Sequence, residues 1–168
     1  MHAPNFQIRD ENKEDAAALS QLSAQAFGPG RFGRTAYRIR EGVAPVSSLA
    51  LTAWLDDRLV GGIRFTAVTI GGEGSALLLG PLVVNPVHNG KGYGKALVAE
   101  GLARARAQGF RLVVLVGDMP YYGRFGFVQV PPGQIRLPGP VEPARLLALD
   151  LVEGALGNAA GVVQAKAA

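Results

Sequence analysis

The feature that most constrains this chain is the glycine-rich stretch VNPVHNGKGYGKAL. It follows SALLLGPLVV, an apolar run typical of a buried strand, and it leads directly into a helical pattern. Gly90, Gly92 and Gly94 alternate with other residues, and Lys91 and Lys95 stand beside them. Glycine leaves the backbone N–H groups at a helix N-terminus open to an anion, which the helix dipole also attracts. The stretch therefore predicts a phosphate-binding loop between a strand and a helix.

The segments after this loop predict a crossover between parallel strands. Small and apolar residues recur at helical spacing, at Gly94, Leu97, Val98, Gly101, Leu102 and Ala105, and Gly109 marks the end of the helix. FRLVVLV then has the composition of a strand that is buried on both faces. Because a crossover helix joins the two strands, we expect residues 110–116 to lie parallel to residues 75–84.

The remaining patterns complete one mixed sheet. They predict a first strand at residues 6–10, a helix that ends at residue 27 before GPGRFG, and a weaker helix at residues 34–40. SLALTAWLDDRLVGGIRFTAVTI predicts two strands joined at Asp56 and Asp57, which form an antiparallel meander with the strand before the loop. RLLALDLV and AGVVQ predict two late strands. We expect an α+β fold, a single domain over residues 1–168 with helices on both faces of the sheet.

Composition excludes several kinds of site. The 168 residues include no cysteine and only two histidines, so we expect neither disulfides nor thiolate chemistry nor a metal. A net charge of +4, without basic runs interleaved with aromatic residues, does not indicate nucleic-acid binding. We find neither an apolar run of membrane-spanning length nor a signal-peptide core, so we expect a cytoplasmic protein that binds no membrane.

Two common phosphate-binding loops do not fit the glycine-rich stretch. The dinucleotide fingerprint requires glycine where Lys95 stands. The nucleotide P-loop requires glycine at Asn89 and serine or threonine at Ala96. A structural turn that only tolerates glycine is the alternative that the loop alone leaves open.

Gly80 and Pro81 interrupt the strand before the loop. Proline donates no ladder hydrogen bond and glycine within a strand often marks a bulge, so we expect pairing with residues 110–116 to fail near Pro81. The resulting gap would accept an extended, amide-bearing ligand on the backbone groups of Leu82 and Val84. Pantetheine attached to a pyrophosphate has this form.

At this point the sequence resembles a known family. LVVNPVHNGKGYGKAL is similar to the acyl-CoA signature of the GNAT superfamily of N-acetyltransferases, a hydrophobic strand followed by Gln/Arg-x-x-Gly-x-Gly/Ala. The signature falls on Asn89, Gly92 and Gly94, with Asn89 in place of the usual Gln or Arg. The resemblance covers about residues 5–130 and its two motifs are the specific part of it.

The second motif is VLVGDMPYYGRFGF, which resembles the closing element of the family, a tyrosine four residues before Gly-Phe. Tyr122, Gly126 and Phe127 match that element, and YYxRFGF further resembles a bacterial subgroup of small predicted acetyltransferases. The resemblance implies that Tyr122 protonates the departing thiolate. Tyr122 as a core aromatic residue is the other interpretation, and the adjacent Tyr121 is the rival candidate for the acid.

The resemblance implies a reaction and a co-substrate. An amine attacks the thioester of acetyl-CoA directly, in a ternary complex. The expected acetyl-CoA-binding residues are Leu82, Val83, Val84, Asn89, Gly90, Lys91, Gly92, Tyr93 and Gly94. A non-catalytic acyl-CoA-binding module and a phosphate-binding domain unrelated to acetyl transfer are the alternatives.

The sequence leaves the general base unassigned. Some relatives carry a glutamate where this chain has Leu78, and we expect Glu73 to be a solvated turn residue. We interpret His88 as a surface residue on the phosphate side of the loop. Arg124 is expected to cap the short aromatic turn.

The acceptor is equally open among polyamines, antibiotics, amino acids and protein N-termini. Four arginines near the second helix allow an acidic acceptor, but we expect a solvated helix face there, at Arg31, Arg34, Arg38 and Arg40. An exposed late strand would allow a homodimer.

Overall fold

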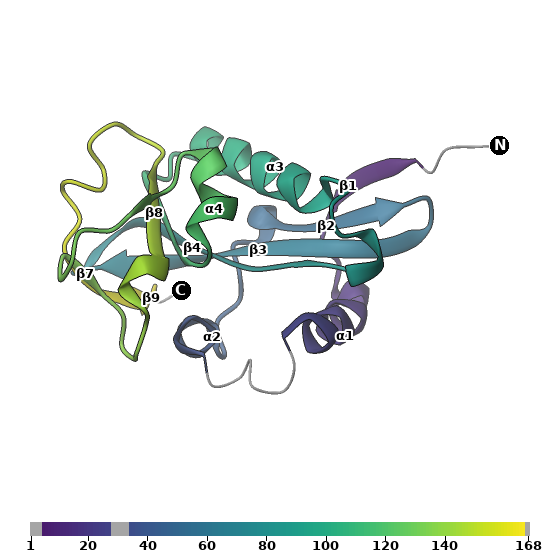
Figure 1. Ribbon diagram of the computed structural model, residues 1–168, viewed down its shortest axis with the longest axis horizontal. Helices are drawn as coiled ribbons and strands as arrows, with labels where there is room; N and C mark the ends of the chain where they lie inside the picture. The colour runs from purple at the N-terminus through teal and green to yellow at the C-terminus, as the bar shows by residue number, and fades with distance from the viewer. Residues whose placement is uncertain (1–4, 28–33, 167–168) are drawn as a thin grey trace.

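A mixed sheet runs through the centre of the structure, and helices cover both of its faces (Figure 1). This computed structural model describes residues 5–27 and 34–166, and these residues form one α+β domain. The break expected at GPGRFG and one of the four arginines, Arg31, lie outside the described residues.

The first half of the sheet is an antiparallel meander, as the alternating sequence pattern predicts. It consists of β1 (Phe6–Asp10), β2 (Ala50–Leu55), β3 (Arg58–Ile70) and β4 (Glu73–Val84), each paired with the next. The turn between β2 and β3 contains Asp56, whose φ of 52° is the one positive value outside glycine in the described chain. Aspartate is among the residues that adopt this left-handed backbone most readily, and Oδ1 of Asp56 accepts a hydrogen bond from the N–H of Asn5 at 3.1 Å.

The second half begins with the predicted crossover. The helix α3 (Tyr93–Ala107) follows the glycine loop, and β5 (Leu112–Val116) lies parallel to β4. The six residues of the predicted apolar stripe of α3 are all buried. The helix ends before Gly109, whose φ is 87°. Parallel pairing and the buried stripe are therefore both confirmed.

Both late strands are present, and each pairs with two other strands. The strand β8 (Leu146–Asp150) pairs with β5 and with β6 (Val128–Gln129). The strand β9 (Gly161–Ala165) pairs with β3 and with β7 (Ile135–Arg136). The strands β6 and β7 are not predictable from the sequence, because two residues are too short to produce a detectable alternation.

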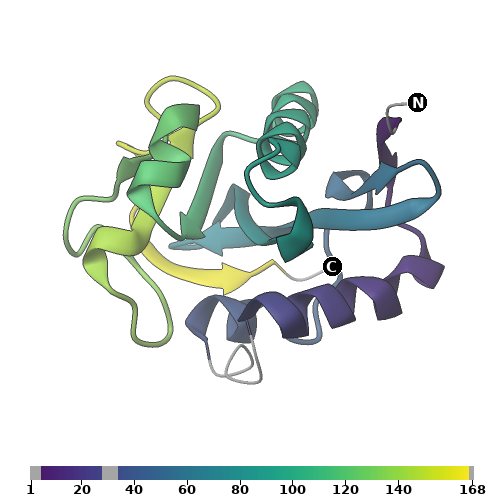
Figure 2. The same ribbon diagram turned by 45° about the vertical axis from the view of Figure 1, so that its right-hand side comes forward.

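Two helical layers cover the sheet. Figures 1 and 2 show α1 (Ala16–Phe27) and α2 (Thr35–Arg40) on one face and α3 on the other, and the short helix α4 (Met119–Tyr122) follows β5. Apolar residues of α3 pack with Leu77 and Leu79, whereas Ile39 of α2 belongs to a second cluster with Leu78. This alternation along β4 is typical of a strand that is buried on both faces.

Candidate active site

A bulge in β4 separates it from β5. Ile63 pairs with Leu82 and Phe65 pairs with Leu79, so Arg64 alone faces both Gly80 and Pro81. Gly80 has a φ of 134°, which only glycine adopts without strain, and the Gly80–Pro81 peptide bond is cis. Such a bulge adds one residue to a strand and bends it.

Pairing between β4 and β5 stops at the bulge, as predicted. The parallel register covers Ala76 to Leu78 of β4 and ends where Leu78 faces Val114. The strand β5 continues to Val116, still paired with β8 on its other edge. The end of β4 and the end of β5 therefore diverge, and the gap opens toward the glycine loop.

The last residues of β4 direct backbone groups into this gap. The N–H of Asn85 donates to the carbonyl of Val60 at 2.7 Å, which makes these residues a hydrogen-bonded pair with β3. Because such pairs alternate along an antiparallel ladder, Val83 also bonds toward β3, whereas Leu82 and Val84 direct their N–H and C=O groups away from it. The backbone of Val83 is thus turned away from the gap, and its side chain packs with Leu19 and Leu22 of α1.

The glycine loop begins with a short turn and ends at α3. The side-chain oxygen of Asn85 accepts a hydrogen bond from the N–H of Val87 at 3.1 Å. Gly90 and Gly92 have φ values of 80° and 84°, and a Cβ atom at either would meet nothing within 4 Å. Gly92 is the N-cap of α3. The loop is therefore an open cradle of backbone N–H groups at a helix N-terminus, and this fits a bound diphosphate.

Some side chains near the cradle are exposed to solvent, and others pack against the rest of the protein. Asn89, Lys91 and Lys95 are exposed. The ring of Tyr93 stacks on Phe6 of β1 with centroids 4.8 Å apart, so only its backbone belongs to the cradle. His88 packs edge-on to Tyr93 and is half-buried, with no hydrogen-bond partner on Nδ1 in the described structure. His88 is therefore less exposed than the surface residue that the sequence predicts, because its ring packs against Tyr93.

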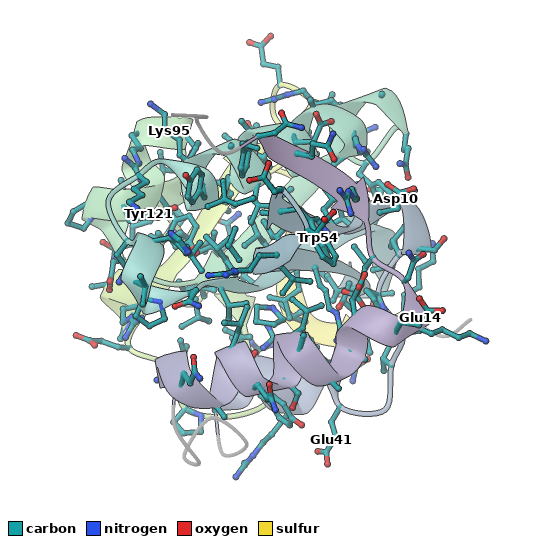
Figure 3. All side chains as sticks on the ribbon, turned by 90° about the vertical axis from the view of Figure 1, so that its right-hand side faces the viewer. Asp10, Glu14, Glu41, Trp54, Lys95 and Tyr121 are labelled. Carbon is teal, nitrogen blue, oxygen red and sulfur yellow. The ribbon has the colours of Figure 1, made fainter. Side chains whose placement is uncertain are left out.

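The two adjacent tyrosines of α4 face different parts of the gap. The hydroxyl of Tyr121 reaches the first turn of α3, at 2.8 Å from the position of a Cβ atom at Gly94. Figure 3 shows Tyr121 and Lys95 on the same side of the molecule. The ring of Tyr122 instead lies against the end of β5, 2.6 Å from the position of a Cβ atom at Gly117.

Tyr122 also belongs to an aromatic cluster. Its ring packs edge-on against Phe127 with centroids 5.8 Å apart and against Tyr121 at 4.9 Å. Burial raises the pKa of Tyr122 far above its usual value, and Tyr121 and Asp118 raise it further. The phenol thus keeps its proton at neutral pH. Arg124 donates to the carbonyl of Tyr121 at 3.1 Å, which confirms its expected role at this turn.

A cavity of about 970 Å³ lies beside the bulge of β4 and the two tyrosines, and no residue of the glycine loop, which the structure describes in full, lines it. It is lined by α1, α2, the bulge of β4, the ends of β5 and α4, and the loop before β8, and both Tyr121 and Tyr122 line it. The hydroxyl of Thr35, at the start of α2, donates to the carbonyl of Pro140 at 2.6 Å. This bond fixes α2 against the loop at the side of the cavity.

Two arginines line the cavity: Arg64, which the sequence did not indicate as a site residue, and Arg40, which we expected on a solvated helix face. Arg64, opposite the bulge, makes a two-pronged ion pair with Glu11, with distances of 2.8 and 2.6 Å. Arg40 of α2 is partly buried, and its Nη1 lies 2.8 Å from the position of a Cβ atom at Gly80. The expectation of a solvated helix face holds for Arg38, which is exposed, but it is wrong for Arg40. Helical periodicity alone does not reveal which side of a six-residue helix faces a cavity.

The described part of the cavity wall contains no carboxylate on β4. Leu78 is fully buried, and Glu73 is exposed in its turn, where it accepts hydrogen bonds from Ser75. Among residues 5–27 and 34–166, no group of three or more histidine, cysteine, aspartate or glutamate side chains is placed to hold a metal ion. Nor does any helix within those ranges combine the length and the apolar character that crossing a bilayer requires.

Residues 16–127 match the Acetyltransferase (GNAT) family. The chain is 32% identical over 130 residues to YjhQ, an uncharacterized N-acetyltransferase of Escherichia coli (strain K12), and this covers 76% of the chain and 71% of that protein. It is 28% identical over 159 residues to YhbS, an uncharacterized N-acetyltransferase of the same organism, with 94% of each covered.

Two solved structures resemble this fold over nearly its whole length. The crystal structure of YhbS from Escherichia coli in complex with CoA has a TM-score of 0.84 at 27% identity and covers 99% of this chain and 92% of that one. A GNAT family acetyltransferase from Brucella melitensis in complex with acetyl-CoA has a TM-score of 0.72 at 31% identity, with 97% of each chain covered.

Proposed function

Because this chain belongs to the Acetyltransferase (GNAT) family, we propose that it binds acetyl-CoA across the gap between β4 and β5 and transfers the acetyl group to an amine. The separation of these strands beyond Leu78 and Val114, with a glycine cradle at its end, is the observation that carries this proposal. The similar structures that hold CoA and acetyl-CoA support it. Acetyl transfer from acetyl-CoA is thus the function of the domain over residues 1–168.

Each part of the gap has a separate task in binding. The backbone N–H groups from Gly90 to Gly94, the exposed side chains of Asn89 and Lys91 and the N-terminus of α3 bind the diphosphate, whereas the N–H of Asn89 donates to the carbonyl of Pro86. The backbone groups of Leu82 and Val84 bind the amide-bearing arm as an added strand would. Val83 supports β4 from the face of α1, and the ring of Tyr93 anchors the loop to β1.

Acetyl-CoA supplies an acetyl group activated as a thioester. The amine nitrogen forms a bond to the acetyl carbon, the carbon–sulfur bond breaks, and the sulfur leaves with the bonding electron pair. Tyr122 lines the cavity and donates its phenolic proton to that sulfur, and solvent later returns a proton to the phenolate. The raised pKa of Tyr122 means that the phenol is protonated before the reaction. The amine loses its proton to a base that stays unassigned, because the described wall has no carboxylate on β4 and its carboxylates come from other elements, at Glu11, Glu41, Asp118 and Glu142.

The cellular setting follows from the co-substrate. Acetyl-CoA as donor supports a cytoplasmic location, and the acceptor is a small molecule or peptide amine and not a nucleic acid or a membrane. A homodimer stays a prediction, since both late strands already have two partners within the chain.

Acetyl-CoA consumption with a panel of primary amines tests the function. We expect free thiol to appear in equal amount with the acetylated amine, detected by mass spectrometry, for at least one polyamine, aminoglycoside, amino acid or peptide. Tight binding of CoA without acetylation of any amine would indicate the non-catalytic acyl-CoA-binding module instead. Equal thermal stabilisation by CoA and by unrelated nucleotides would indicate a general phosphate-binding domain.

A further inference from the structure

Arg40 is a cation at the point where β4 and β5 separate. It ends α2, and its guanidinium lies over Gly80, one of the two residues of the bulge. Arg64, the residue opposite this bulge, lies near enough to repel the charge of Arg40. Both guanidinium groups line the same cavity as Tyr122.

No carboxylate pairs with Arg40 among the residues that the structure describes, and the acidic group that favours its charged form is the phenol of Tyr37. Glu11 is engaged by Arg64, and Asp118 pairs with Arg145 at 3.6 Å. Glu41, the next residue in the chain, is exposed and points away from the sheet (Figure 3). Within the described ranges Arg40 has neither an ion pair nor a hydrogen bond to its guanidinium.

The surroundings of Arg40 in the cavity disfavour its positive charge. Burial, together with the charge of Arg64, lowers the pKa of Arg40 to about 10. Arg40 is therefore still protonated at neutral pH. A partly desolvated charge without a partner is costly, and an anion that enters the cavity removes that cost. A guanidinium also presents paired donors whose spacing matches the two oxygens of a carboxylate.

We propose that Arg40 binds a carboxylate of the acceptor, so that the acceptor is an amine that also carries a carboxylate group, such as an amino acid. This inference rests on the proposed function and names the class of its substrate. Because Gly80 lies directly under Nη1 of Arg40, the carboxylate accepts from the side of the guanidinium that faces the cavity, and the amine extends toward Tyr122 in the same cavity. Arg64 supports the site by repelling competing cations while Glu11 holds its side chain in place.

The test compares amines that differ only in the carboxylate. Glycine, β-alanine and L-phenylalanine are each paired with the corresponding carboxamide, which has the same carbon skeleton and a neutral end. We expect the wild-type protein to prefer the carboxylate of at least one pair by about 10- to 100-fold in kcat/KM, the range typical of a hydrogen bond to a charged group. β-Alanine, compared with the two α-amino acids, shows how far the carboxylate lies from the amine.

Substitutions assign this preference to Arg40. In Arg40→Gln the ratio between carboxylate and carboxamide should fall to near one through a higher KM for the carboxylate. Arg40→Lys should keep part of the preference, because an ammonium retains the charge but not the paired donors. Arg38→Gln is the matched control, since Arg38 lies two residues away on the same helix and is exposed. Thermal unfolding and the Kd for CoA of each variant report whether the fold and the co-substrate site persist.

Several results would overturn the inference. They are a preference for carboxamides, acetylation of polyamines alone, or a carboxylate preference that survives in Arg40→Gln. If no amine is acetylated at all, the proposed function fails. The inference about Arg40 can still be tested by measuring how amino acids bind to the protein. In that case the thermal stabilisation of the CoA-bound protein by the three amino acids must exceed that by their carboxamides, and the excess must be absent in Arg40→Gln.

Discussion

The hydroxyl of Tyr121 lies 2.8 Å from the position that a Cβ atom would take at Gly94, so an aromatic ring from α4 reaches the first turn of α3 across the end of β4. The Cγ2 atom of Val84 lies 3.4 Å from the same position. The absence of a side chain at Gly94 thus allows three elements to meet where the proposed gap for acetyl-CoA begins.

Replacement of Gly94 by alanine should therefore weaken CoA binding and destabilise the protein. Alanine gains about 1 kcal/mol over glycine within a helix, but the new methyl group collides with the Tyr121 hydroxyl. In a Tyr121→Phe background the collision is relieved, and Gly94→Ala should then raise the unfolding temperature. A double-mutant cycle by thermal unfolding measures this coupling, and additive effects of the two substitutions would contradict it.

Gly92→Ala should remove CoA affinity by a backbone effect. Its φ of 84° is strained for alanine by about 1–2 kcal/mol, and relief of this strain turns the N–H groups of the cradle. Gly109→Ala is a matched control, because its φ of 87° lies at the other end of the same helix and a Cβ atom there also meets nothing within 4 Å. Calorimetric titration with CoA should show a loss only for Gly92→Ala, although both variants unfold at lower temperature. Equal CoA affinity in the two variants would show that the cradle does not bind the diphosphate.

Tyr122→Phe should lower kcat by about 100-fold or more, because the departing thiolate loses its proton donor. The affinity for CoA should stay near the wild-type value, since the ring and its packing on Phe127 remain. Tyr121→Phe serves as the comparison and should retain turnover. Steady-state kinetics with the best acceptor measure kcat for both variants. A loss of turnover in Tyr121→Phe but not in Tyr122→Phe would assign the acid to Tyr121.

The pH dependence of kcat follows from the raised pKa of Tyr122. Below the pKa of the bound amine the rate rises with pH, as more amine loses its proton. Because burial keeps the phenol protonated beyond the ordinary tyrosine pKa of about 10, the rate should not fall as pH approaches that value. A pH–rate profile with saturating substrates measures this. A decline centred near pH 10 that disappears in Tyr122→Phe would contradict the role of burial.

Much of the fold and of the cofactor cradle is predictable from the sequence because these features are local. Only glycine adopts positive φ freely, so Gly90 and Gly92 mark the cradle before any tertiary contact is known. Proline has no N–H to donate, so Pro81 marks the end of pairing between β4 and β5. The apolar stripe of α3 and the apolar run of β5 require only their own periodicity and composition to be recognised.

The directions of individual side chains, by contrast, depend on contacts between distant segments, and only the tertiary structure decided them. The ring of Tyr93 turns to β1, because Phe6 lies there to stack with it. Arg40 enters the cavity because the bulge at Gly80 leaves room for its guanidinium. Arg64 meets a partner 53 residues away, at Glu11. The periodicity of a sequence indicates which face of its own helix or strand a residue occupies. The charges around the proposed acceptor site come from separate elements, and only the tertiary structure brings these elements together.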